Sequence, residues 1–311
     1  MILKTSNAFS PFPEFGKLTL ADKAEFDALV KDFPPIYDAS FTGLMTWWSQ
    51  LDNVSVSRLN DNLVIPYYLP GDEAHSGLSL IGTNKADESI TTIFDYLREQ
   101  GRPVRLVNVP EFVITNVQFH DMFIFKEERK YSEYIYPIAR FYPLKNMPLY
   151  WRKKIQRAQK DIDSGKIVVR SLDFHSETDS KLLLNAVNEW QSKGMNDYGL
   201  VEKDTIKETI INAAPLDIEN LCLFVDGKLH GFCLYNVPSD KRYIVVKHVK
   251  ATHSSTLGFE LIGYMFAKRF SELGITHVNL NADYGKLKLR MFMLALGPSN
   301  FFRKYIVEPA K

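Results

Sequence analysis

The sequence predicts an α/β (α+β) protein of two fused halves, each a mixed, mostly antiparallel sheet flanked by helices. Its 311 residues exceed what one hydrophobic core usually holds, which favours two domains. Asp226-Gly227 separates two strand-like runs and has the composition of a two-residue hairpin turn. The same succession of helices, short strands, helix and strand occurs twice. We therefore expect an N-terminal domain at 1–125 and a C-terminal domain at 126–311.

The first half starts with helical patterns and then changes to the period of strands. Thr19 is a suitable cap for a helix that ends before Pro34. Asn60-Asp61-Asn62 has the composition of a turn, and Gly101 is expected to end an amphipathic helix. Helices are expected at 19–31, 40–50 and 85–100, and strands at 54–59, 63–69, 78–81 and 104–109.

The second half repeats this plan with clearer signals. Helices are expected at 179–193, 202–213 and 255–273, and strands at 221–225, 228–236, 241–250 and 276–281. Two helices, an antiparallel meander, a helix and a strand is the order in which a GNAT domain is built. We therefore predict a degenerate GNAT-like half followed by a catalytic GNAT-like half, joined by a strand within 126–145.

Composition limits the function classes. The net charge of +1 argues against a surface adapted throughout to nucleic acid, although it allows a local basic patch. No segment approaches the roughly 20 apolar residues of a membrane span, and the N-terminus does not resemble a signal peptide. We expect a cytoplasmic protein, with peripheral attachment to the inner membrane face as an alternative.

The two cysteines, Cys222 and Cys233, are too few for a disulfide framework or a four-ligand zinc site. Counting from Asp226-Gly227 places both on one face of the hairpin, where we expect buried, reduced thiols. The histidines are scattered, so no metal site is predicted. No tightly bound cofactor is predicted either.

Short motifs occur in a fixed order along the chain. They are Tyr134-Ile135-Tyr136, a helix that carries Arg152, Lys250-Ala251 on a strand, Asn279 with Asp283 and Gly285, Leu289-Arg290, Pro298, and Lys304-Tyr305. In this order they resemble the family of the phosphatidylglycerol lysyltransferase C-terminal domain (DUF2156). The resemblance covers roughly residues 40–307. It implies a tandem GNAT fold, and the best-known branch of the family moves lysine from its tRNA to a lipid head group.

The sequence departs from the family motifs at four positions. The glutamates of the motifs E-K-A and N-x-E-x-D are replaced by Val249 and Asn281, and Lys153 and Met293 stand where the family has asparagine and lysine. The resemblance therefore implies transferase chemistry, while lysine and lipid as substrates do not follow from it.

A donor site is expected where the helix at 255–273 begins. Ser254, Ser255 and Thr256 precede Gly258, so N–H groups and hydroxyls could bind a phosphate at the positive end of the helix. The alternative is that Ser255 only caps a core helix. Lys250, on the preceding strand, could stabilise an oxyanion or hold a donor phosphate, or be a solvated lysine.

The other catalytic candidates are Asn279, Asp283, Arg290 and Tyr305. Asp283 and Arg290 lie seven residues apart across Gly285, a spacing that predicts a carboxylate–guanidinium pair. That pair could hold an incoming amino acid or fix the loop. Asn279 is expected at the strand end, and Tyr305 is either a general acid or a core residue.

Two basic runs could bind a polyanion. The first, which includes Arg152, lies at 152–160, and the second, which includes Lys304, lies at 286–311. A tRNA acceptor arm and anionic lipid are candidate ligands, and two solvated faces are the alternative. Arg152 and Lys304 complete the predicted donor-binding set.

The predicted function is transfer of an acyl or aminoacyl group from an aminoacyl-tRNA or acyl-CoA donor to an amine or hydroxyl of a small molecule or lipid head group. Two alternatives are a non-catalytic binding module with the same fold and an acetyl-CoA-dependent N-acetyltransferase acting on a small amine.

Overall fold

The computed structural model describes residues 9–46, 54–68, 76–192, 198–237, 242–251 and 259–310. The chain forms two compact units, and neither is continuous in sequence. The first unit comprises Met1–Glu133, Ala282–Phe292 and Phe301–Lys311, and the second comprises Tyr134–Asn281 and Met293–Asn300. The predicted division after residue 125 therefore falls inside the first unit. This unit also includes two segments from the C-terminal part of the chain.

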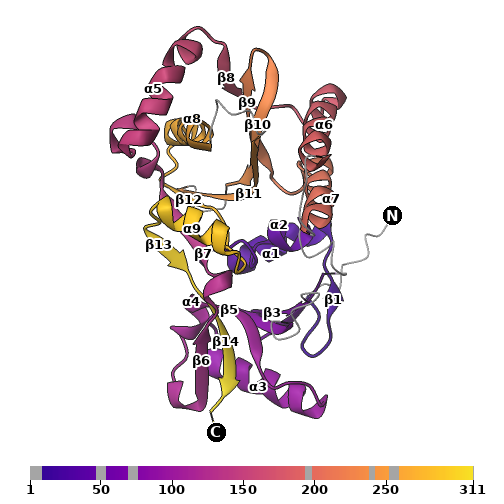
Figure 1. The fold of residues 1–311 in the computed structure, drawn as a ribbon. Helices are drawn as coiled ribbons and strands as arrows, with labels where there is room; N and C mark the ends of the chain where they lie inside the picture. Colours follow the sequence, from indigo (N-terminus) through magenta and orange to yellow (C-terminus); the bar gives the residue numbers. More distant parts are fainter. Residues whose placement is uncertain are drawn as a thin grey trace. The chain divides into compact units, whose positions relative to one another are not determined.

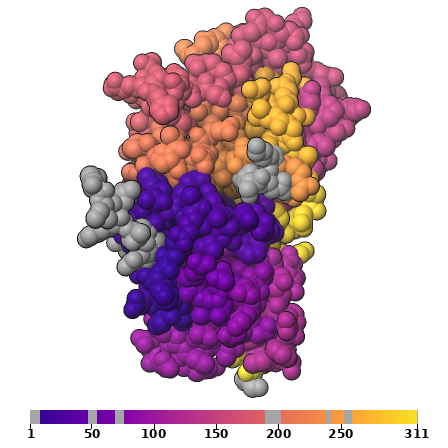
Figure 2. All heavy atoms as spheres, turned by 180° about the vertical axis from the view of Figure 1, so that it is seen from behind, coloured from indigo at the N-terminus to yellow at the C-terminus, as the bar shows by residue number. Residues whose placement is uncertain are grey.

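The first unit is built on a seven-stranded sheet in the order β1-β2-β3-β4-β5-β14-β6. Its strands are β1 (Gly16–Lys17), β2 (Ser55–Leu59), β3 (Asn62–Tyr67), β4 (Gly77–Ile81), β5 (Leu106–Pro110), β6 (Phe123–Glu127) and β14 (Lys304–Pro309). Its helices include α1 (Lys23–Val30), α2 (Phe41–Thr46), α3 (Ala86–Glu99), α4 (Glu111–Ile114) and most of α9 (Leu287–Ala295). The space-filling view from behind shows the indigo and purple N-terminal part of this unit as one continuous surface (Figure 2).

Local signals explain where these elements begin and end. Thr19 caps the short 3-10 helix Leu20–Asp22 that leads into α1, and Asp22 accepts the backbone N–H of Thr19 at 2.7 Å, so the predicted cap lies one turn ahead of α1. Asn60 and Asp61 have φ angles of 50° and 61°, as a tight turn between β2 and β3 requires. The predicted hairpin is therefore confirmed. Helix α3 packs its buried Ile90, Phe94 and neighbours onto the sheet.

The second unit holds most of the other seven-stranded sheet, in the order β13-β7-β12-β11-β10-β9-β8, while Glu133 of β7 and the last two residues of β13 are assigned to the first unit. Its strands are β7 (Glu133–Pro137), β8 (Ile167–Arg170), β9 (Glu219–Val225), β10 (Lys228–Asn236), β11 (Tyr243–Ala251), β12 (His277–Asn279) and β13 (Asn300–Phe302). Its helices are α5 (Leu149–Asp163), α6 (Glu177–Ser192), α7 (Tyr198–Ile211) and α8 (Phe259–Glu272). In Figure 1, α5 and α8 lie on one side of this sheet, and α6 and α7 lie on the other.

The order of elements confirms the predicted GNAT-like architecture in both halves. Each half runs through an antiparallel meander and then a helix that leads into a strand parallel to the last meander strand, β4 to β5 in the first unit and β11 to β12 in the second. In the part of the chain that the structure describes, no helix has the length and apolar character to span a bilayer.

The hairpin of β9 and β10 corrects one prediction. Asp226 and Gly227 have φ angles of 49° and 74°, so the predicted turn is confirmed. The register then shifts between Leu229 and Gly231, and Cys222 pairs with Phe232 while Cys233 pairs with Leu221. The two free, buried cysteines therefore face opposite sides of the sheet, and their predicted placement on one face was wrong because a bulge adds a residue.

Candidate active site

Within the second unit the pairing of β11 with β12 ends where β12 itself ends, at Asn279, and this end of the pairing is called the separation of the two strands. They pair in parallel from Tyr243 opposite His277 to Val245 opposite Asn279, and β11 then continues to Ala251. Strand β10 follows β11 on its other edge as far as Ala251, so the extension is held in place. An extended ligand can pair with a strand edge of this kind. The separation is therefore a candidate position for the donor.

The extended part of β11 presents different chemistry on its two faces. Val249 pairs with Cys233 and faces α8, and both residues line an apolar cavity of about 60 Å³. Lys250 pairs with Phe232 and faces the opposite side, where α7 packs. Because successive side chains of a strand point to opposite faces, apolar Val249 lies on one face of the sheet and the cation of Lys250 on the other.

Lys250 is held by a carboxylate that the sequence did not single out. Glu202, on α7, lies 2.6 Å from Nζ of Lys250, and both side chains are 19% exposed. The fully buried imidazole of His248 has Nδ1 3.8 Å from the same carboxylate oxygen. Burial lowers the pKa of His248 below its ordinary 6.5, so the ring is neutral at pH 7. The three side chains thus comprise a partly exposed ion pair of Lys250 and Glu202 and the buried, neutral ring of His248.

The carboxylate of Glu202 should make the second unit sensitive to acid. Burial acts to raise its pKa, but His248 and Lys250 outweigh burial and lower the pKa from 4.5 to about 2. The resulting stabilisation is fully present above pH 4.5 and is lost as the pH falls towards 2, by up to roughly 3 kcal/mol. Glu202→Gln should flatten this part of the acid-unfolding curve, measured by urea titration at each pH. Glu177→Gln, in an exposed pair with Lys181, is the control.

The predicted donor cradle, Ser254, Ser255, Thr256 and Gly258, lies outside the described residues, so it stays a prediction. Asn279 is fully buried at the end of β12, where its Oδ1 accepts the backbone N–H of Asn281 at 2.8 Å. That bond holds Asn281 at a φ of 71°. Asn279 therefore shapes the end of the strand.

The predicted pair of Asp283 and Arg290 is confirmed within the first unit. Nε and Nη2 of Arg290 each donate to a carboxylate oxygen of Asp283 at 2.9 Å. Asp283 is fully buried, accepts the N–H of Gly285 at 2.8 Å, and lies 3.5 Å from Arg129. Both oxygens are thus used inside the chain, a geometry that fixes the loop. A role in holding an amino acid stays a prediction.

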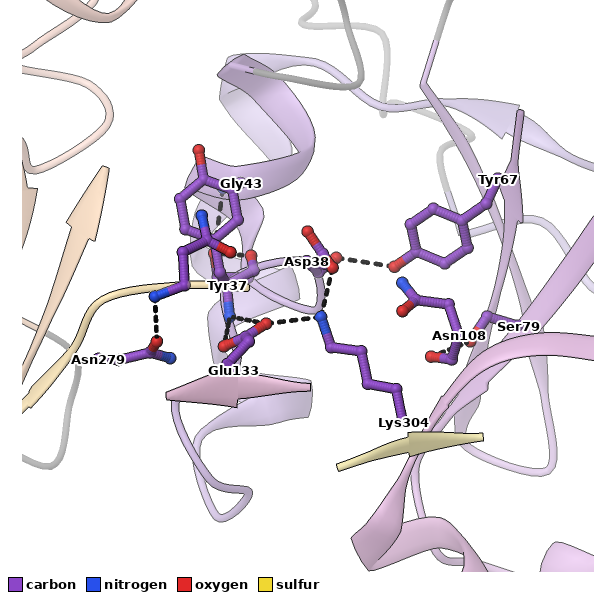
Figure 3. Close-up of polar contacts among 11 residues, drawn as sticks. Tyr37, Asp38, Gly43, Tyr67, Ser79, Asn108, Glu133, Asn279 and Lys304 are labelled. Carbon is purple, nitrogen blue, oxygen red and sulfur yellow. Dashed lines mark hydrogen bonds and ion pairs between the residues drawn. The ribbon is translucent and has the colours of Figure 1, made fainter. Parts of the chain in front are cut away.

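Lys304 lies in a buried ionic cluster of the first unit, not on its surface. Its side chain is fully enclosed, with Nζ in contact with Asp38 and 2.6 Å from Glu133 (Figure 3). Glu133 also accepts the backbone N–H of Tyr37 at 2.9 and 3.0 Å. Burial acts to lower the pKa of Lys304, but the two carboxylates outweigh it and raise the pKa. Lys304 therefore does not contribute to the basic surface predicted at 286–311.

Tyr305 and Arg303 are engaged in the same sheet. The side chain of Tyr305 packs against the core that α3 covers, and burial followed by the charge of Glu111 raises its pKa. Arg303 pairs with Glu111 at 2.9 Å. Tyr305 is thus partly buried at the margin of this core, and its role as an acid stays a prediction.

Arg152 belongs to α5 of the second unit, whereas Lys304 belongs to the first. Its side chain is half-buried, and within the described residues its Nε is enclosed without a hydrogen-bond partner. Elsewhere on α5, Lys154 pairs with Glu260 at 2.8 Å. Among the described residues no three His, Cys, Asp or Glu side chains gather as metal ligands.

Sequence reasoning missed Glu202, His248 and the acidic partners of Lys304. Glu202 lies 48 positions from its partner on a helix of ordinary composition, and Asp38 lies 266 positions from Lys304. No local pattern connects such residues. The alternation of β11 could have shown that Val249 and Lys250 face opposite sides.

Comparison with known proteins adds a family and three similar structures. Residues 36–284 match the family described as phosphatidylglycerol lysyltransferase, C-terminal. A conserved protein of unknown function from Bacteroides thetaiotaomicron has a TM-score of 0.77 and 21% identity, covering 96% of this chain and 99% of its own. No curated protein sequence matches this chain.

Two further solved structures are similar to this chain in fold. The C-terminal domain (DUF2156) of a protein assigned as a lysylphosphatidylglycerol synthetase from Agrobacterium fabrum has a TM-score of 0.62 at 14% identity, covering 94% of this chain and 93% of its own. L-PGS from Bacillus licheniformis has a TM-score of 0.58 at 13% identity, covering 97% and 93%. At these identities the similarity concerns the fold. Because the family match spans residues 36–284 of 311, the chain belongs to the phosphatidylglycerol lysyltransferase C-terminal family, as its motifs predicted.

Proposed function

We propose that this protein transfers an acyl or aminoacyl group from an activated donor to an amine or hydroxyl acceptor, and that the second unit does the chemistry. The observation that carries the proposal is the separation of β11 from β12 after Val245 and Asn279. Membership of a family named for a lysyltransferase supports the reaction class. The donor is an aminoacyl-tRNA or an acyl-CoA, and the acceptor is a small molecule or a lipid head group.

The reaction needs no covalent enzyme intermediate. The nucleophilic nitrogen or oxygen of the acceptor forms a bond to the donor carbonyl carbon, and the bond from that carbon to the ribose oxygen or the thioester sulfur breaks. The proton of the nucleophile ends on the leaving oxygen or sulfur. The protein contributes by aligning the two substrates, with the donor extended along β11.

Lys250 is the residue we assign to the developing negative charge. Its side chain is 19% exposed on the α7 side of β11, and Glu202 holds its ammonium group at 2.6 Å. A positioned cation lowers the energy of an oxyanion more than that of a neutral carbonyl, so it accelerates the chemical step. Cys233 is not suited to be a nucleophile, because burial raises the pKa of its thiol.

The proposal is tested with the full chain and two donor panels, total tRNA charged with each amino acid in turn and a series of acyl-CoA thioesters. Acceptors are anionic lipid vesicles and a set of primary amines. Transfer of radiolabel to an acceptor from one of the donor panels is the expected result. Binding of donors without any transfer would instead support a non-catalytic module and contradict the proposal.

Lys250→Gln is expected to lower kcat/KM for transfer by about 10²-fold, the usual cost of losing one oxyanion-stabilising group. The matched control is Lys228→Gln, which removes an exposed lysine from β10 of the same sheet and should leave the rate unchanged. Circular dichroism checks that both variants are folded. Full activity of Lys250→Gln would show that Lys250 does not stabilise the oxyanion.

A further inference from the structure

The cavity beside the end of the β11–β12 pairing has no charged side chain in its walls among the described residues. It lies between β11 and α8, with Val246 and Val249 on one side and Phe266 on the other, and Leu280 follows directly after β12. Among the described residues, its walls consist of apolar side chains, one glycine and Cys233. Burial raises the pKa of Cys233, so the thiol is uncharged at neutral pH.

The cavity adjoins the place where the proposed function puts the donor. Val246 and Val249 belong to the part of β11 that has separated from β12, while Val278 and Leu280 belong to β12 and the residue after it. The cavity is therefore lined by residues on both sides of the point where the pairing of β11 and β12 ends, next to the proposed position of the donor carbonyl. Val249 forms part of the wall at a position where the motif resemblance expects a glutamate.

The volume limits what the cavity can hold. A dry apolar cavity of about 150 Å³ takes one benzene, which corresponds to about 25 Å³ for each non-hydrogen atom. On that scale a cavity of about 60 Å³ holds two or three such atoms. An ammonium or carboxylate there would lose its hydration without gaining a partner from the walls, and burial of that kind costs several kcal/mol.

We infer that the cavity selects the transferred group, which is a small uncharged acyl group with two or three non-hydrogen atoms beyond the carbonyl carbon. Propionyl and butyryl groups meet this description among thioesters. Among aminoacyl esters, whose α-amino group must stay outside the cavity, alanyl comes nearest with two carbons beyond the carbonyl carbon, and valyl follows with four. The inference rests on the proposed function, because it takes the separated strands to be the donor site. It assigns Val249 as a specificity-determining residue.

The first arm of the test compares kcat/KM for acetyl-, propionyl-, butyryl-, hexanoyl- and succinyl-CoA, and for alanyl-, valyl-, leucyl- and lysyl-tRNA. Short uncharged groups should be transferred best on whichever carrier the protein uses. Each methylene beyond the optimum should cost about 10-fold or more, and the charged succinyl or lysyl group should cost at least as much. A preference for succinyl or lysyl groups would overturn the inference while leaving the proposed transfer in place.

Variants of Val249 test whether this residue determines the specificity for the acyl group. Val249→Ala enlarges the cavity and should move the optimum towards a longer chain by one or two carbons. Val249→Thr keeps the shape of the side chain but adds a hydroxyl, so it should lower kcat/KM for the preferred uncharged donor. Val168→Ala deletes the same methyl groups from an exposed position on β8 and is the control for chain-length preference. An unchanged optimum in Val249→Ala contradicts the inference.

The second arm measures binding without turnover. S-propyl-coenzyme A is titrated against coenzyme A, and 3′-alanylamino-3′-deoxyadenosine against its lysyl counterpart, by isothermal calorimetry. The propyl or alanyl probe should bind at least 10-fold more tightly on one of the two carriers. Equal affinities on both carriers, or tighter lysyl binding, would overturn the inference even where no transfer is detected. Absence of transfer with selective binding would refute the proposed function alone.

Discussion

Replacing Lys304 by methionine is expected to lower the free energy of unfolding of the first unit by about 3–5 kcal/mol. Lys304 is fully buried between the carboxylates of Asp38 and Glu133. Without it, two buried negative charges lose their common cation, and removing one member of a buried ion group costs more than the group contributed. Urea unfolding followed by circular dichroism measures the change.

Two controls separate this effect from the loss of any lysine. Lys126→Met removes the cation of a more exposed pair with Glu308 in the same sheet, and it should cost less than about 1 kcal/mol. A triple variant, Lys304→Met with Asp38→Asn and Glu133→Gln, should regain part of the lost stability because no charge stays buried. A single variant as stable as the wild type would show that the cluster is not enclosed in solution.

Gly43→Ala is expected to destabilise the first unit by about 3 kcal/mol, the upper part of the range for overpacking. A Cβ at position 43 would lie 2.0 Å from the carbonyl oxygen of Tyr37. Backbone cannot rotate away as a side chain can, so Tyr37 must shift, and its N–H is the donor to Glu133. The clash therefore disturbs the ionic cluster drawn in Figure 3.

The same substitution at Gly263 should have the opposite sign. Gly263 lies inside α8, and a Cβ there would meet no atom within 4 Å. Alanine in a helix interior is favoured over glycine by about 0.5–1 kcal/mol, so Gly263→Ala should raise the midpoint of thermal unfolding. If both variants were equally destabilised, the close approach at Gly43 would not be the cause.

Local sequence signals predicted most elements of the fold, because each has a local physical cause. Asp226-Gly227 specifies its turn through the φ angles that both residues adopt, and Gly101 follows α3 with a φ of 62°. The return of β14 between β5 and β6 has no such signal, since strand pairing across the chain depends on packing. The prediction that Cys222 and Cys233 share a face failed for a related reason, because nothing local predicts the bulge at His230.

The candidate site was predicted in part. The spacing of Asp283 and Arg290 indicated their ion pair because seven residues across a glycine turn can close into a loop. The sequence could not show that Lys304 is buried or that Glu202 meets Lys250, because each contact joins distant segments. Composition cannot show a cavity either, since its walls are core residues that come from several elements far apart in the sequence.

The position of β14 bears on how the protein is made. Residues 304–309 supply an inner strand of the sheet whose other strands come from the first 127 residues, and they pair with β5 on one side and β6 on the other. A ribosome synthesises that strand only after the whole of the second unit. During synthesis, the sheet of the first unit therefore lacks the strand that pairs with both β5 and β6. The second unit can form most of its structure before the sheet of the first unit is complete.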